Sequence, residues 1–72
     1  MLDMSRVEAV RQAAERQDWN AAADLYIDLS LQMRGTRDRV RVEALAPFVR
    51  LRDAAGIDAV VRELRAADER PD

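Results

Sequence analysis

The segment from Asp18 to Met33 constrains the fold more than any other stretch, because apolar side chains surround most of one predicted helix. It contains the only tryptophan and the only tyrosine of the chain. At 100° per residue, its apolar side chains span roughly 200° of a helical wheel. These side chains are Trp19, Ala22, Ala23, Leu25, Tyr26, Ile27, Leu29 and Met33. One neighbour cannot cover so wide a face, so we expect other helices to pack on two sides of this one.

The composition indicates an all-α protein of one domain, residues 1–72. Only two Gly and two Pro occur among the 72 residues, which favours long helical stretches. The chain has no Cys and no His, which excludes disulfides and zinc sites built from these residues. No apolar run approaches the ~18 residues that span a bilayer, and the N-terminal sequence lacks a signal-peptide pattern. We therefore expect a cytoplasmic protein without a metal or cofactor.

Capping signals predict that the first half forms an antiparallel helical hairpin. Ser5 and Glu8 fit a capping box, with Ser5 as N-cap of a helix over about residues 6–16. Asp18 is a suitable N-cap for the next helix, over about residues 19–33. A link of one or two residues forces the two helices to run antiparallel.

The second half predicts another hairpin. Gly35 is placed to end the preceding helix in a left-handed conformation. Pro47 removes a backbone donor, so we expect the next helix to kink or break near Ala46. Gly56 closes that helix, and Asp58 is the expected N-cap of the last one.

The broken helix carries two apolar faces. One face carries Val40, Ala44, Phe48, Leu51 and Ala55, and the adjacent face carries Val42, Leu45 and Val49. Together the signals predict an all-α fold of four helices, arranged as two stacked antiparallel αα-hairpins in a small bundle. The hairpins cover about residues 5–34 and about residues 37–69.

The two halves echo each other in sequence. Residues 17–26 align with residues 55–64 at an offset of 38 positions, which pairs Trp19 with Ile57 and Tyr26 with Leu64. Such an echo is typical of stacked helical hairpins.

Trp19, Ala22 and Tyr26 give an aromatic after the turn, a small residue three on, and an aromatic four further on. This pattern resembles the tetratricopeptide repeat, although Gln17 stands at the usual turn glycine and Arg34 at the closing proline. The resemblance implies a protein or peptide partner, bound in a groove lined by the first helix of each hairpin. The residues mapped to that groove are Val7, Arg11, Ala14, Leu45, Val49 and Arg52.

Charge is segregated along the chain. Residues 34–52 carry a net charge of +4, whereas the segments on either side each carry −3. The arginines of this basic segment are Arg34, Arg37, Arg39, Arg41, Arg50 and Arg52. They can pair with the acidic ends of the same chain, which we favour, or bind an acidic protein or phosphate groups.

Other patterns have less specific interpretations. Asp24 and Asp28 share one helix face, which we interpret as solvated rather than as a metal or acid–base pair. Phe48 and Leu31 border polar arcs of their helices and are the expected exposed apolar anchors.

We therefore predict a non-enzymatic protein–protein interaction module of bacterial or phage origin. A small adaptor, an assembly subunit and an inhibitor all fit, and a homo-oligomer stays open. The alternative is a nucleic-acid-binding regulator that uses the arginines of residues 34–52.

Overall fold

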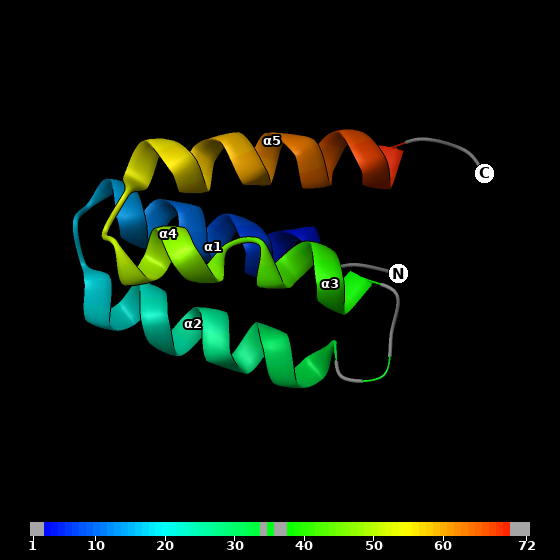
Figure 1. Cartoon of the computed structure of the whole chain (residues 1–72), viewed down its shortest axis with the longest axis horizontal. Helices are drawn as coiled ribbons and strands as arrows, with labels where there is room; N and C mark the ends of the chain where they lie inside the picture. Colours follow the sequence, from blue (N-terminus) through cyan, green and yellow to red (C-terminus); the bar gives the residue numbers. More distant parts are fainter. Residues whose placement is uncertain (1–2, 34, 36–37, 70–72) are drawn as a thin grey trace.

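The computed structural model describes residues 3–33, 35 and 38–69 and confirms the all-α fold. Five helical segments are present in this part of the chain: α1 (Met4–Glu15), α2 (Trp19–Gln32), α3 (Asp38–Glu43), α4 (Ala46–Arg50) and α5 (Ala54–Glu69). Segments α3 and α4 run on in one direction and together take the place of one long helix (Figure 1). The result is the predicted arrangement of two antiparallel hairpins.

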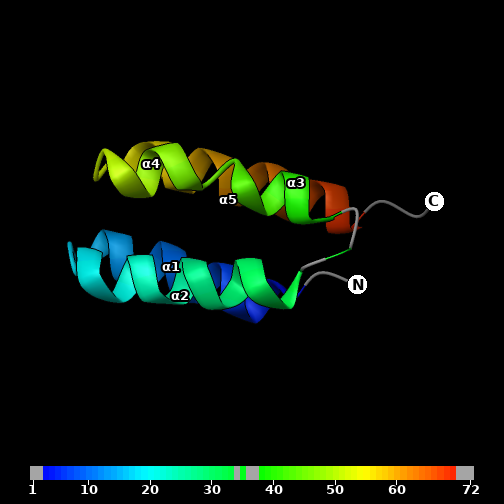
Figure 2. The ribbon, with the colours of Figure 1, turned by 60° about the horizontal axis from the view of Figure 1, so that its bottom comes forward.

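The helices form a closed ring around one core. α1 packs against α2 and α5, α2 also packs against α3 and α4, and α4 packs against α5. Figure 2 shows α1 and α2 in one layer and α3, α4 and α5 in the other. The first helices of the two hairpins are therefore diagonal to each other. The core cluster consists of Val7, Val10, Ala14, Leu29, Met33, Val42, Leu45, Ile57, Val60, Val61 and Leu64.

The wide apolar face of α2 is only partly buried. The helix packs on two sides as expected, against α1 and against α3 and α4. Trp19 and Tyr26 are half-buried against the core, and Ile27 is 54% exposed. The buried side chains of this segment are Ala22 and Leu29 on α2 and Met33 directly after it. The two neighbours cover the centre of the face and leave its edge open.

The predicted start of the first helix is wrong. Asp3 is the N-cap, and its carboxylate accepts hydrogen bonds from the backbone N–H groups of Ser5 (3.1 Å) and Arg6 (3.4 Å). A carboxylate is a strong acceptor at the positive end of a helix dipole, so the helix begins two residues earlier than the capping box predicted. Glu8 instead bonds to Arg11 (2.7 Å) and pairs with Arg65 on α5.

The turn between α1 and α2 is a Schellman motif. The N–H of Gln17 donates to the carbonyl of Ala14 (3.0 Å), and that of Asp18 donates to Ala13 (2.9 Å). Gln17 adopts the left-handed conformation, with φ of 59°. Asp18 then caps α2, as expected, and accepts from the N–H of Ala21 at 3.2 Å.

The turn between α4 and α5 repeats this pattern. The N–H of Arg52 (φ 55°) donates to Val49 at 3.2 Å, and that of Asp53 donates to Phe48 at 2.9 Å. The Asp53 carboxylate accepts from the N–H of Gly56 at 3.0 Å. Asp53, rather than Asp58, therefore caps the last helix, because it directly follows the left-handed residue.

The equivalent turns show that the internal repeat has an offset of 35 positions, so the predicted offset of 38 is wrong. At this offset Asp18 matches Asp53, and residues 3–9 match residues 38–44. Both of those segments read Asp-x-x-Arg-Val-Glu-Ala. The internal sequence repeat thus begins at the first helix of each hairpin.

Of the kink or break expected near Ala46, the structure shows a break. Ala44 and Leu45 form a turn with i→i−3 hydrogen bonds, and α4 begins at Ala46 with Pro47 in its first turn. Proline is tolerated there because the first N–H groups of a helix need no intrahelical partner. Gly35 has φ of 81°, so its expected left-handed conformation is confirmed.

Gly56 lies inside α5 rather than in the turn. The ring of Phe48 packs directly on it, and a Cβ at this position would clash with the ring carbons of Phe48. The glycine thus allows a close approach of α4 and α5.

Candidate functional site

An apolar stripe runs along the outside of α3 and α4. Val42 and Leu45 face the core and are fully buried. The opposite side presents side chains at spacings of four, three and four residues, which keeps them on one face of a helix. We call this set the outer stripe: Val40, Ala44, Pro47 and Leu51. All four residues are exposed, Val40 at 74% and Leu51 at 73%.

Three residues of the outer stripe, Val40, Ala44 and Leu51, belong to one of the two apolar faces predicted for the third helix, whereas Pro47 was not assigned to either face. A helix at the edge of a small bundle buries one face only, and here the face of Val42 and Leu45 is buried. Phe48 is an intermediate case, half-buried against Gly56 rather than exposed. The expectation of an exposed Phe48 anchor is therefore wrong, whereas Leu31 on α2 is 64% exposed as predicted.

Arginines border the outer stripe. Arg39 pairs with Glu43 of the same helix at 2.9 Å. Arg50 and Arg52 are exposed and form no ion pair with any residue that the structure describes. The favoured pairing with the acidic ends of the chain is thus not observed for these three arginines. Arg34 and Arg37 lie outside the described residues.

A cavity of about 310 Å³ opens between α3 and α5. It is lined by Arg41, Ala44, Glu63, Leu64 and Ala67. Leu64 belongs to the core, and Ala44 belongs to the outer stripe as well. The cavity and the outer stripe therefore meet at Ala44.

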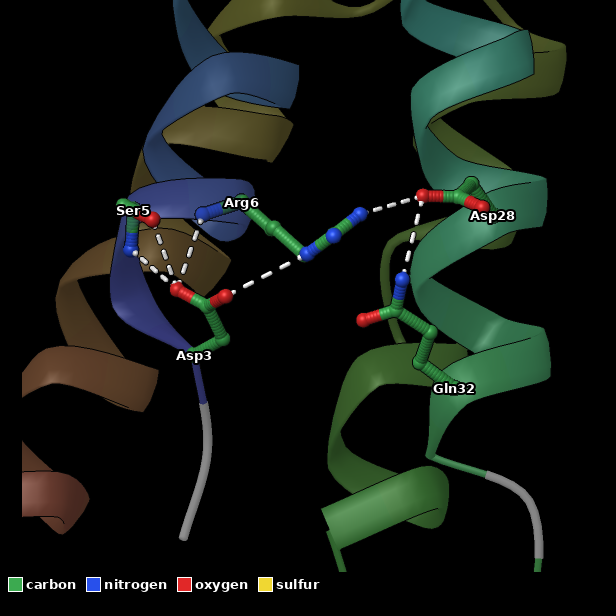
Figure 3. Close-up of polar contacts among 5 residues, drawn as sticks. All are labelled: Asp3, Ser5, Arg6, Asp28 and Gln32. Carbon is green, nitrogen blue, oxygen red and sulfur yellow. Dashed lines mark hydrogen bonds and ion pairs between the residues drawn. The ribbon is translucent and has the colours of Figure 1, made fainter.

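The equivalent positions of the first hairpin are bridged by polar side chains (Figure 3). Arg6 and Asp28 lie 35 positions before Arg41 and Glu63, and Arg6 Nη1 donates to Asp28 Oδ2 at 2.5 Å. Gln32, which is equivalent to Ala67, donates to the same oxygen at 3.4 Å. No such ion pair joins the described residues Arg41 and Glu63. In the second hairpin Ala67 takes the place of Gln32, and a cavity lies between α3 and α5 where the first hairpin has its polar bridge.

Asp3 extends the polar bridge of the first hairpin. Arg6 Nε lies 3.3 Å from Asp3 Oδ2, and the Ser5 hydroxyl donates to Asp3 Oδ1 at 2.7 Å. The Ser5 hydroxyl, two backbone N–H groups and the Arg6 charge together lower the pKa of Asp3.

The tetratricopeptide resemblance expects α1 and α3/α4 to line one groove, and these first helices of the two hairpins lie diagonally across the core (Figure 2). Val7 and Leu45 are fully buried and Ala14 is 1% exposed, so these residues belong to the core. Arg11 lies on α1 and bonds to Glu8 (2.7 Å) and Glu15 (2.5 Å).

The other mapped residues lie near the outer stripe. Val49 is half-buried on α4, and Arg52 is exposed in the turn that follows. Partner binding by Arg11, Val49 and Arg52 stays a prediction.

Neither a metal site nor a membrane span is found in the described part of the chain. None of its acidic residues forms a group of three that could hold a metal ion. No described helix is long and apolar enough to cross a bilayer.

No protein-family model matches this chain, and no curated protein or solved structure is significantly similar to it.

Proposed function

We propose that this chain is a non-enzymatic protein–protein interaction module that binds its partner through the outer stripe. The observation that supports this is the exposure of Val40, Ala44, Pro47 and Leu51 at helical spacing along α3, α4 and the turns that follow them. Single exposed apolar residues are common, but a contiguous apolar patch rimmed by polar groups is typical of an interaction site.

The dimensions of the chain support the same function. A bundle of 72 residues buries a small core, and burial of the outer stripe against a partner adds apolar contact area that the core lacks. The tetratricopeptide-like pattern points to the same class of function. An adaptor, an assembly subunit or an inhibitor each fits such a module.

Site-specific photo-crosslinking in the source cells tests this function. A photoreactive amino acid replaces Leu51 in one variant and Leu31 in the control variant, since Leu31 is similarly exposed but lies on α2. We expect defined protein conjugates at position 51 that are absent at position 31. Equal labelling at both positions, or no protein conjugate at position 51, contradicts the proposal.

A nucleic-acid-binding function is the second candidate, favoured by Arg50 and Arg52, which lack an acidic partner among the described residues. Binding to phosphate releases counterions, so the affinity for duplex DNA would fall steeply with salt. Fluorescence anisotropy over a salt series, with Arg50→Ala and Arg52→Ala combined, distinguishes this candidate from the protein-binding one. Loss of a salt-dependent DNA affinity in that variant supports it, whereas unchanged weak binding contradicts it.

A further inference from the structure

We infer that the partner segment is an acidic amphipathic helix that lies along α3 and α4 and places one neutral apolar side chain in the α3–α5 cavity. This inference rests on the proposed function and adds the chemistry and orientation of the partner.

The outer stripe suits a helix better than an extended strand. Its side chains follow helical spacing over α3 and α4, and no open strand edge occurs among the described residues. An amphipathic helix recognises such a surface through apolar side chains at spacings of three and four residues. A partner helix of three turns matches the length from Val40 to Leu51.

The lining of the cavity indicates which kind of partner side chain, here called the anchor, can enter it. Its volume of about 310 Å³ lies at the lower end of the usual range for ligand pockets, ~300–1,000 Å³. Leu64, Ala44 and Ala67 supply apolar walls. Arg41 and Glu63 also line the cavity, so a cationic anchor would meet Arg41 and an anionic anchor would meet Glu63. A neutral, apolar anchor avoids both conflicts.

The residues around Leu51, at the C-terminal end of the outer stripe, indicate the charge of the partner. Arg50 and Arg52 flank Leu51 and have no acidic partner among the described residues. Leu51 lies seven residues after Ala44, which corresponds to about two helical turns or ~10 Å. The acidic residues of the partner therefore lie about two turns from its anchor.

Stripe-to-stripe pairing of two copies of this chain is disfavoured by charge. The described side chains of residues 39–52 include the arginines Arg39, Arg41, Arg50 and Arg52 and the single acid Glu43. Two such faces brought together would oppose like charges, which suppresses association. An acidic helix meets the same face with complementary charge.

Selection from a display library of helical peptides tests the inference without a bias toward charge. The full chain is the target, and the library varies every exposed peptide position over acidic, basic and apolar residues. We expect the selected peptides to be enriched in Asp and Glu, with one large apolar residue about two turns away. Basic or uncharged peptides, or no enrichment above a target-free selection, would overturn the inference.

Three variants of the chain locate the bound peptide. Leu51→Asp and the double variant Arg50→Glu with Arg52→Glu should each weaken binding at least tenfold. Ala67→Gln, which introduces the residue of the first hairpin into the cavity, should weaken it by a factor of at least three. The matched controls, Leu31→Asp on α2 and Arg62→Glu on α5, alter exposed residues outside the stripe and the cavity lining and should change the affinity less than twofold. Circular dichroism checks that all variants stay folded.

The outcomes separate this inference from the proposed function. If Leu51 crosslinks to a protein in cells but the selection returns peptides without acidic enrichment, the function stands and the partner chemistry is wrong. If the stripe variants and the control variants lose peptide affinity equally, the peptide does not bind at the outer stripe and the surface assignment is wrong. Self-association through the stripe, seen by sedimentation and removed by Leu51→Asp, would also overturn the inference.

Discussion

The two hairpins have the same turn but differ in the side chains that lie between their two helices. In both, a left-handed residue is followed by an aspartate that caps the next helix, with the same pattern of backbone hydrogen bonds. In the first hairpin Arg6, Asp28 and Gln32 form a polar bridge between α1 and α2. In the second hairpin the equivalent Arg41, Glu63 and Ala67 line a cavity. Backbone geometry thus determines the turn. A few side chains determine whether a polar bridge or a cavity lies between the two helices.

The same comparison applies to packing near the turns. The first hairpin has two small residues there, the buried Ala13 on α1 and the half-buried Ala21 on α2. The second hairpin has Phe48 at the position equivalent to Ala13, and its ring packs on Gly56. The second hairpin thus combines a large ring with a glycine, whereas the first has alanine at both equivalent positions, Ala13 and Ala21. The broken α3–α4 segment accompanies the pair of ring and glycine, and it carries the outer stripe.

The largest expected effect comes from the shared core. Leu29 and Leu45 are fully buried, one in each hairpin, so Leu29→Ala and Leu45→Ala should each lower the free energy of unfolding by ~2–5 kcal/mol. Because both leucines belong to one cluster, each variant should unfold in a single transition in far-UV circular dichroism. Loss of about half the helical signal in one variant would show that the hairpins unfold separately.

The close packing of Phe48 on Gly56 gives the next effect. Gly56→Ala should destabilise the fold by ~1–2 kcal/mol, since overpacking costs ~1–3 and the gain in helix propensity offsets up to ~1. Adding Phe48→Leu should recover part of this loss, because the added methyl group meets the ring. Thermal unfolding measures both.

The equivalent position in the first hairpin is the control. Ala21→Gly changes helix propensity without touching a ring, so it should cost ~0.5–1 kcal/mol. If Gly56→Ala stabilises the protein instead, α4 packs less closely on α5 than the structure indicates.

The caps should behave alike in both hairpins. Asp18 accepts from Ala21 at 3.2 Å and Asp53 accepts from Gly56 at 3.0 Å, so Asp18→Ala and Asp53→Ala should each cost ~0.5–2 kcal/mol. Urea denaturation of the two variants tests this equality. A difference above ~1 kcal/mol would mean that the shared turn geometry does not imply shared energetics.

Much of the fold was predictable from the sequence, because it follows from local signals. Asp18 as a cap, the break at Pro47 and the left-handed Gly35 each depend on the chemistry of one or two residues. The register of the second hairpin was not predictable in this way. Gly56 is a strong turn signal, but its actual role is to make room for Phe48, which only the packing of α4 on α5 reveals.

The candidate surface was less predictable than the fold. The sequence shows two apolar faces on the third helix, and which of them is buried depends on where α2 and α5 lie. The sequence therefore did not show that Val40 and Leu51 are about three quarters exposed. The repeated Asp-x-x-Arg-Val-Glu-Ala segments, at residues 3–9 and 38–44, were the signal for the correct register.

The smallest expected effect concerns Asp3, which is exposed and caps α1 of the bridged hairpin. Its pKa is lowered from 3.8, chiefly by the hydrogen bond from the Ser5 hydroxyl. A folded-state pKa below the unfolded value means that Asp3 stabilises the fold fully above pH ~4, and that this stabilisation is lost as the pH falls further. Asp3→Asn retains a capping oxygen but does not titrate. The difference in unfolding free energy between the natural chain and Asp3→Asn should therefore be constant from pH 7 to pH 5 and should shrink below pH 4. Urea denaturation at pH 7, 5, 4 and 3 measures it, and a difference that stays constant to pH 3 would show that the Asp3 charge contributes nothing to the bridge.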